Sequence, residues 1–300
     1  MKKYIGVDLG GTNVRVAVIT EDGEILAQLK SPSYAKEGRE KVLDNLYSLI
    51  KQLPDWDKCD GIGAGVPGPV NQALGAMMLD TNLPGFKNFP FAKDMTEKLG
   101  IPSFIDNDAN VAGLAEALLG AGKGYPVVYY TTLSTGIGGA LIVDGKCVGG
   151  KHGFGGEIAN IIIDRNREKV NYLNAGAVEN EASGTAVVRK GRAALGEDVI
   201  KHAGQVFDLA NKGNEKAKAI VEEVTGDLAQ LYATLAGVCD PDIFVLGGGM
   251  MNSADDILPK VIEKYKAITH EALHDTPFAV ASLEEPGIVG AAMLPRSKGI

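Results

Sequence analysis

The sequence is poor in cysteine, in basic charge and in long apolar runs. Its three cysteines, Cys59, Cys147 and Cys239, form no Cys-x-x-Cys pair, which excludes a disulfide framework and favours a reducing compartment. With 30 basic and 38 acidic residues the formal net charge is −8, which argues against binding nucleic acid or anionic membranes through a basic face. No apolar run approaches the roughly 18 residues of a membrane helix, and no leader peptide is recognisable. We therefore expect a cytoplasmic protein.

Two common nucleotide-binding signatures are also missing. The sequence has no Gly-x-x-x-x-Gly-Lys-Ser/Thr loop, and no Gly-x-Gly-x-x-Gly that opens a helix and is followed by a ribose-binding acid. Glycine itself is abundant, with 39 residues in 300, about twice its usual share of roughly 7%. The glycines occur in clusters, and clustered glycines let backbone N–H groups approach an anion closely.

The two halves of the chain repeat the same order of elements. Each half begins with two apolar runs around a glycine-rich loop, continues through an Asp-Gly turn and later adds a further strand beside glycines. Chance similarity between two α/β units is the alternative interpretation. The repeat predicts an α/β protein of two domains, which face each other across a cleft where a small ligand binds. The expected domains are 1–118 and 119–286, the second with an insertion at about 150–204, and the helix at 287–300 packs back on the first.

Three glycine-rich loops are candidates for binding a nucleotide. Backbone N–H groups and threonine hydroxyls suit phosphates, a turn without side chains suits a flat adenine ring, and the carboxylate of Asp8 could hold magnesium. Tight structural turns are the alternative at each loop. The candidate residues are Asp8, Gly10, Gly11, Thr12 and Asn13 in the first loop, Thr135, Gly136 and Gly138 in the second, and Gly247 and Gly248 in the third.

Asn107 and Asp108 precede an alanine-rich stretch that is predicted to be helical. Asn and Asp are preferred helix caps, so capping is one interpretation. The other is that Asp108 accepts a proton from a substrate hydroxyl during phosphoryl transfer, a reaction that needs positioning and a nearby carboxylate. Asp106 is a neighbouring candidate for the same role. Glu157 and Glu179 could accept hydrogen bonds from sugar hydroxyls, with simple surface exposure as the alternative.

Taken in order, these motifs resemble the ROK family (repressors, open reading frames and sugar kinases) over nearly the whole chain. The resemblance implies a two-domain actin-like ATPase (ribonuclease H-like) fold with an interdomain cleft, binding of ATP and Mg²⁺, and often a homodimer. It implies transfer of the γ-phosphate of ATP to the 6-hydroxyl of a hexose, with Asp108 as the general base. By the same match, the sugar-binding residues are Gly68, Asn82, Asn107, Asp108, Glu157, Asn160 and Glu179.

One segment departs from the family pattern. Family members usually carry a histidine and three cysteines that bind a structural zinc ion. Here Asn160 stands at the histidine position, and Val170, Tyr172 and Ala177 stand at the cysteine positions. We therefore predict no structural zinc, and a sugar preference that extends from glucose to related hexoses and β-glucosides. A catalytically silent sugar-binding regulator is the alternative function. A DNA-binding repressor is not expected, because the first phosphate motif begins at Asp8.

Overall fold

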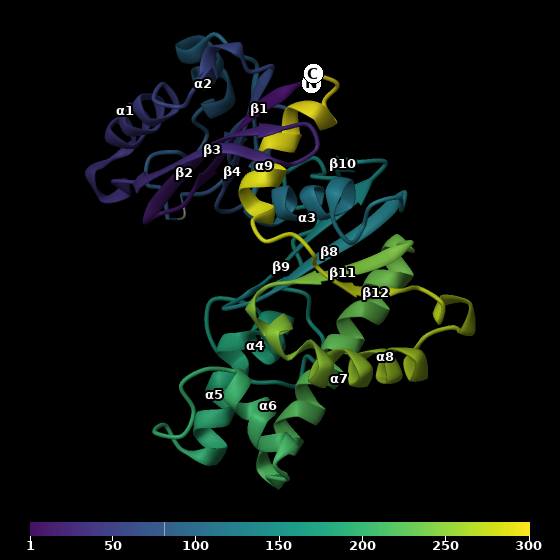
Figure 1. The fold of residues 1–300 in the computed structure, drawn as a ribbon. Coiled ribbons are helices and arrows are strands. Elements are labelled where there is room, and N and C mark those ends of the chain that lie inside the picture. Colours follow the sequence, from purple (N-terminus) through teal and green to yellow (C-terminus); the bar gives the residue numbers. More distant parts are fainter. Residues whose placement is uncertain (81) are drawn as a thin grey trace. The chain divides into compact units, whose positions relative to one another are not determined.

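The computed structural model describes residues 1–80 and 82–300, which divide into two compact units (Figure 1). Unit 1 comprises Met1–Pro126, Ala140–Gly156 and Ser282–Ile300. Unit 2 comprises Val127–Gly139 and Glu157–Ala281. Within the described residues, no helix combines the length and apolar character needed to cross a membrane.

The first five-stranded sheet lies in unit 1 and has the order β3-β2-β1-β4-β7. Strands β1 and β2 are antiparallel, as are β2 and β3, whereas β1, β4 and β7 run parallel. Asp8, Gly65 and Asp106 are register partners across these parallel strands, so the carboxyl ends of the strands bring the candidate residues to one edge. The strand bounds are Lys3–Leu9 (β1), Asn13–Thr20 (β2), Ile25–Pro32 (β3), Gly61–Val66 (β4) and Ser103–Asn107 (β7), and Val70–Asn71 (β5) pairs with Ala76–Met77 (β6).

A glycine-rich central strand lets a helix lie directly on this sheet. A Cβ atom at Gly63 of β4 would overlap the carbonyl oxygen of Ala291 in α9, so the close approach of helix to strand requires glycine there. The C-terminal helix α9 packs against β1 and β4 and also against α3. The helices of unit 1 are Arg39–Ile50 (α1), Phe91–Leu99 (α2), Asp108–Leu119 (α3) and Pro286–Ser297 (α9), with short 3₁₀ turns at Ala35–Glu37 (η1) and Trp56–Lys58 (η2).

The second five-stranded sheet has the order β10-β9-β8-β11-β12. Element for element this is the order of the first sheet. Here too the last two strands in sequence, β11 and β12, run parallel to their neighbours. The repeat expected from the sequence is therefore confirmed at the level of topology. The bounds are Val127–Leu133 (β8), Ile137–Val143 (β9), Lys146–Cys147 (β10), Ile243–Gly247 (β11) and Phe278–Val280 (β12).

An aromatic cluster fixes the long helices of unit 2 to this sheet. Tyr232 of α7 and Tyr265 of α8 make edge-to-face contacts with Phe278, and Phe244 of β11 stacks at a tilt on the same ring. Such pairs add to the burial of apolar area. The helices are Val178–Ala182 (α4), Gly184–Leu195 (α5), Gly204–Asn211 (α6), Glu215–Cys239 (α7) and Ala254–Ile268 (α8), with 3₁₀ turns at Gly249–Ser253 (η3) and Glu271–Leu273 (η4).

Candidate active site

The first glycine loop joins β1 to β2 and borders a pocket of about 350 Å³. Gly10 N donates to Asn13 O at 2.9 Å, which closes the turn. The pocket is open to solvent and holds both a carboxylate and cationic side chains. It is lined by Asp8, Gly10, Gly11, Thr12, Asn13, Arg15 and Lys30.

Arg15 is a residue of this pocket that the motif search missed. In the β1–β2 hairpin Arg15 stands opposite Asp8, and its Nη2 and Nε donate to Asp8 Oδ2 at 2.6 and 3.1 Å. Its Nη1 donates to Glu285 Oε1 at 3.0 Å. The register of a hairpin with this loop predicts that Arg15 lies opposite Asp8. This register was the sequence feature from which Arg15 could have been found. Arg15 and Lys30 make the pocket more suitable for a polyphosphate than the glycines alone would.

Asp106 lies at the same edge of the sheet but is almost fully buried, with 1% of its surface exposed. Its carboxylate accepts hydrogen bonds from Gln72 Nε2 at 2.7 Å, Asn110 Nδ2 at 2.8 Å and Asn107 N at 2.8 Å. Desolvation raises the pKa of Asp106, and these three bonds oppose the rise. Because its oxygens are occupied by protein donors, Asp106 is suited to holding its neighbours in place.

Asn107 caps helix α3. Its Oδ1 accepts from the backbone N–H groups of Ala109 and Asn110, and its Nδ2 donates to Gly68 O at 3.1 Å. Gly68 has a φ of +79°, a conformation that favours glycine. Asn107 thus ties the start of the helix to the Gly68 segment, and both ends of its amide are engaged within the protein.

Asp108 is the first residue of α3 and, unlike Asp106, exposes its side chain to solvent. Its Oδ1 accepts from Ala109 N at 2.8 Å. Desolvation by the surrounding protein raises the pKa of Asp108, and the negative charge of Asp8 raises it further. This charge effect places Asp108 near Asp8 and therefore near the first glycine loop. The register of β1, β4 and β7, which aligns Asp8 with Asp106, agrees with this placement.

Asn82 lies beside the first glycine loop. A Cβ atom built on Gly11 would come within 2.7 Å of Asn82 Cβ, so glycine is needed for this approach. The two residues border a pocket of about 410 Å³, together with Thr12, Ala35, Lys36 and Pro84. Unit 1 therefore brings together Asp8, the first loop, Gly68, Asn82, Asn107 and Asp108.

The second glycine loop, in unit 2, borders a larger pocket of about 580 Å³. Ser134 N donates to Gly136 O at 2.9 Å, and Gly184 N at the start of α5 donates to Ser134 O at 2.8 Å. The loop thus adjoins a helix N-terminus, where backbone N–H groups favour an anion. The lining mixes small, polar and apolar groups: Ser134, Thr135, Gly184, Thr185, Val188, Lys201, His202, Ala203, Gly204, Phe207, Gly249, Met250, Asn252 and Ser253.

The third glycine cluster meets this pocket at the end of β11. Gly248 has a φ of +88°, and a Cβ atom there would overlap the backbone of Leu133. Gly247 is buried against Tyr130, whose hydroxyl would lie 2.5 Å from a Cβ atom at that position. Gly249 and Met250, just beyond the predicted residues, line the pocket itself. Residues of the second loop and residues just beyond the third therefore line the same pocket.

The predicted sugar residues of unit 2 differ in their surroundings. Glu179 Oε2 accepts from Ile137 N, next to the second glycine loop, at 2.9 Å. Asn160 is exposed, and its Oδ1 accepts from Asn174 N at 2.8 Å. Glu157 is exposed at the beginning of the second segment of unit 2. Glu179 is thus the candidate sugar residue that directly contacts the loop predicted to bind phosphate.

Comparisons with known proteins cover almost the whole chain. The family model described as "ROK family" matches residues 4–298. Over 97% of this chain and 96% of the relative, the sequence is 30% identical to the glucokinase of Thermotoga maritima. It is 29% identical to an N-acetylmannosamine kinase of Escherichia coli, over 97% of each chain.

Solved structures give the same result. The ROK hexokinase from Thermus thermophilus has a TM-score of 0.84 and 31% identity over 97% of each chain. A ROK family glucokinase from Streptomyces griseus, solved in complex with glucose and AMPPNP, has a TM-score of 0.75 and 26% identity over 97% of this chain and 98% of that one. These likenesses confirm the predicted actin-like ATPase fold.

Proposed function

This chain belongs to the ROK family, and we propose that it is an ATP-dependent sugar kinase that transfers the γ-phosphate of ATP to the 6-hydroxyl of a hexose. Support comes from the glucokinase and hexokinase relatives and from the neighbour that binds glucose with an ATP analogue. Glucose, N-acetylhexosamines, fructose and β-glucosides are the candidate acceptors.

The observation that carries the proposal is the pairing of Asp108 with the first glycine loop. A solvent-accessible carboxylate with a raised pKa stands within electrostatic reach of Asp8, whose loop forms a pocket with two cationic side chains. A general base works best when its pKa moves toward the working pH. This arrangement suits a hydroxyl that loses its proton while it attacks a phosphate held in the loop.

In the proposed reaction, the 6-oxygen of the sugar forms a bond to the γ-phosphorus of ATP. Its proton passes to Asp108, and the bond between the γ-phosphorus and the β,γ-bridging oxygen breaks to release ADP. Phosphoryl transfer needs positioning and charge stabilisation more than covalent help. Backbone N–H groups of the first glycine loop, with Arg15 and Lys30, would stabilise the charge on the phosphates.

Asp8 is the residue that fits a magnesium ion. Both hydrogen bonds from Arg15 reach Asp8 Oδ2, so Oδ1 is the oxygen that would serve a metal ion or its water ligand. Oxygen ligands are those that Mg²⁺ prefers. When bound, the ion would neutralise charge on the phosphates of ATP.

The proposal is tested by ADP release from the purified protein with ATP, Mg²⁺ and a panel of about twenty monosaccharides and β-glucosides. We expect sugar-dependent ADP with at least one hexose. Asp108→Asn keeps the oxygen that accepts from Ala109 N but removes the base, and it should lower kcat by roughly 10²–10⁴-fold while sugar binding changes little. Asp255→Asn, in the exposed first turn of α8, is the matched control and should keep full activity.

Two outcomes would contradict this assignment. Near-native turnover by the Asp108→Asn enzyme would show that Asp108 is not the general base. Sugar binding without ADP release from any acceptor would favour the silent regulator instead.

A further inference from the structure

A polar network in unit 2 links a loop of little regular structure to three helices, α4, α5 and α7. Residues 158–177 contain a single bridge, Ile162 to Ala177, among the described residues of this segment. The segment contains Asn160 near its start and leads into α4, which carries Glu179. Tyr172 within it is 85% exposed. Neither sheet pairing nor apolar burial therefore explains how most of this loop is held.

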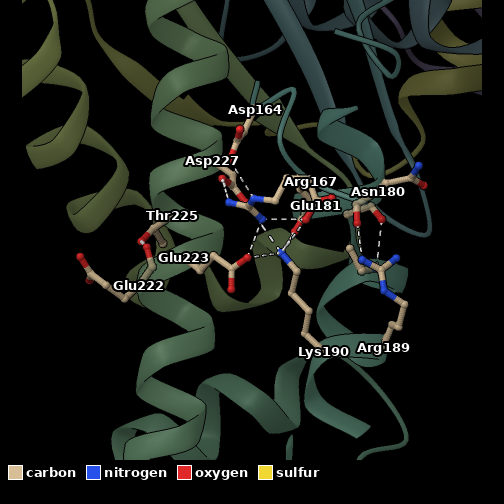
Figure 2. A network of polar contacts seen from close by, with 12 residues as sticks. Asp164, Arg167, Asn180, Glu181, Arg189, Lys190, Glu222, Glu223, Thr225 and Asp227 are labelled. Carbon is tan, nitrogen blue, oxygen red and sulfur yellow. Dashed lines mark hydrogen bonds and ion pairs between the residues drawn. The ribbon is translucent and has the colours of Figure 1, made fainter. Parts of the chain in front are cut away.

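Besides backbone bonds such as that from Glu179 N to Ala159 O, the side chain of Arg167 attaches the loop to its surroundings (Figure 2). Its Nη1 donates to Glu181 Oε2 of α4 at 2.8 Å, and its Nη2 donates to Asp227 Oδ1 of α7 at 3.0 Å. Nη1 also reaches Glu223 on α7, and Nε donates to Asp164 within the loop at 3.3 Å. One guanidinium thus bonds the loop to itself and to two helices, a geometry that suits its planar set of donors.

Lys190 of α5 completes the network from the other side. Its Nζ donates to the carbonyl of Glu181 at 2.7 Å, and it lies 3.1 Å from Glu181 Oε2 and 3.0 Å from Glu223 Oε1. Glu181 and Asp227 are buried, with 4% and 8% of their surfaces exposed. Buried carboxylates destabilise a fold strongly when a cationic partner is removed. Removing Arg167 should therefore loosen the packing of the loop against α4 and α7.

The network reaches the predicted sugar residues through the short helix α4. Glu181 is two residues from Glu179, whose carboxylate accepts from Ile137 N at 2.9 Å. Loop residue Asn171 accepts from Asn180 Nδ2 at 3.0 Å, and Asn160 accepts from loop residue Asn174 at 2.8 Å. Movement of the loop would therefore displace both Asn160 and α4.

We propose that Arg167 is a positioning residue for sugar binding: it fixes the 158–177 loop and α4 so that Asn160 and Glu179 keep the geometry that recognises the sugar. This inference rests on the proposed kinase function. Glu179 and Asn160 contact the sugar, whereas Arg167 acts through them. Loss of the Arg167 side chain should therefore weaken sugar binding more than ATP binding.

The test uses Arg167→Met, which keeps the aliphatic length and removes the charge, and Arg167→Lys, which keeps the charge but not the forked contacts. Arg165→Met is the matched control, since Arg165 is an exposed arginine of the same loop. For Arg167→Met we expect the sugar KM to rise roughly tenfold, equivalent to about 1.4 kcal/mol, with the ATP KM within about twofold. Arg167→Lys should be intermediate, and Arg165→Met should match the wild type.

Limited chymotrypsin digestion gives a readout that needs no catalysis. Cleavage after Tyr172 should be faster in Arg167→Met than in the wild type or in Arg165→Met. If the wild type is a kinase but Arg167→Met keeps its sugar KM within twofold, or if both substrate KM values rise equally, the positioning role is wrong. If the wild type releases no ADP with any sugar, the proposed function fails and the sugar-positioning role fails with it, whereas the digestion still shows whether Arg167 holds the loop.

Discussion

Glu116 offers a sharp test of how unit 1 is held together. This α3 residue has none of its surface exposed. Its carboxylate accepts from Ala121 N at 2.9 Å, from Leu283 N at 2.9 Å and from Ser282 N at 3.0 and 3.1 Å. Ser282 is where the chain returns to unit 1 after unit 2. One side chain therefore satisfies three backbone donors from two segments that are about 160 residues apart in the sequence.

Replacing Glu116 with glutamine keeps the shape but turns one acceptor into a donor. At least one buried N–H group then faces another N–H group, and an unsatisfied buried group costs about 1–3 kcal/mol. Loss of the charge also weakens the remaining bonds, because bonds to an ionised acceptor are roughly twice as strong as neutral ones. We expect the free energy of unfolding to fall by roughly 2–4 kcal/mol.

The assay is urea-induced unfolding combined with hydrogen exchange. Glu97→Gln is the control, because Glu97 is exposed on α2 and pairs only loosely with Lys93 at 3.7 Å, a contact worth less than about 1 kcal/mol. In Glu116→Gln the amides of Ala121, Ser282 and Leu283 should exchange faster than in the wild type. A loss of stability below about 0.5 kcal/mol, with unchanged exchange at these amides, would refute this reasoning.

Two further predictions concern charge. Desolvation raises the pKa of Asp227 to about 6, with Glu223 and Glu181 adding to the rise and Arg167 and Lys190 opposing it. The folded protein therefore holds a proton that the unfolded chain has lost between about pH 4 and 6, so stability should fall as the pH rises through this window, by at most about 1.4 kcal/mol per pH unit. Asp227→Asn should remove this contribution in urea titrations from pH 4 to 8, and an unchanged pH profile would contradict it. Arg15→Met should raise the ATP KM roughly tenfold with the sugar KM little changed. An unaltered ATP KM in initial-rate assays would show that Arg15 does not contribute to phosphate binding.

Local chemistry made several structural features of the candidate site predictable from the sequence. Glycine clusters are conspicuous because they are needed where backbones approach closely, and the structure shows such approaches at Gly11, Gly63 and Gly248. The order of elements predicted the repeated topology, since strands and turns are encoded within short stretches of chain. Asn107 as the cap of α3 follows from residue preference alone.

Contacts between distant segments were not predictable in the same way. Arg167, Glu181 and Asp227 come from a loop and two helices, and no periodicity or spacing marks them as partners. In the sequence, Glu116 looks like any glutamate near the end of a helix. Its hydrogen bonds to the backbone of residues 282–283 are visible only in the structure. Arg15 lies between these cases, because hairpin register would have placed it opposite Asp8.

The choice between Asp106 and Asp108 as the proposed base rests on how burial distinguishes two similar side chains. Asp106 lies in β7 and Asp108 directly follows that strand, and desolvation raises the pKa of both. Asp106, however, accepts three protein hydrogen bonds in a closed environment, so protonating it would disrupt the bonds that hold Asn107, Asn110 and Gln72. Asp108 is one residue beyond the strand, where its side chain meets solvent and the charge of Asp8. A proton can therefore reach Asp108 and leave it again without disturbing the sheet edge, which is what a base that works in every turnover requires.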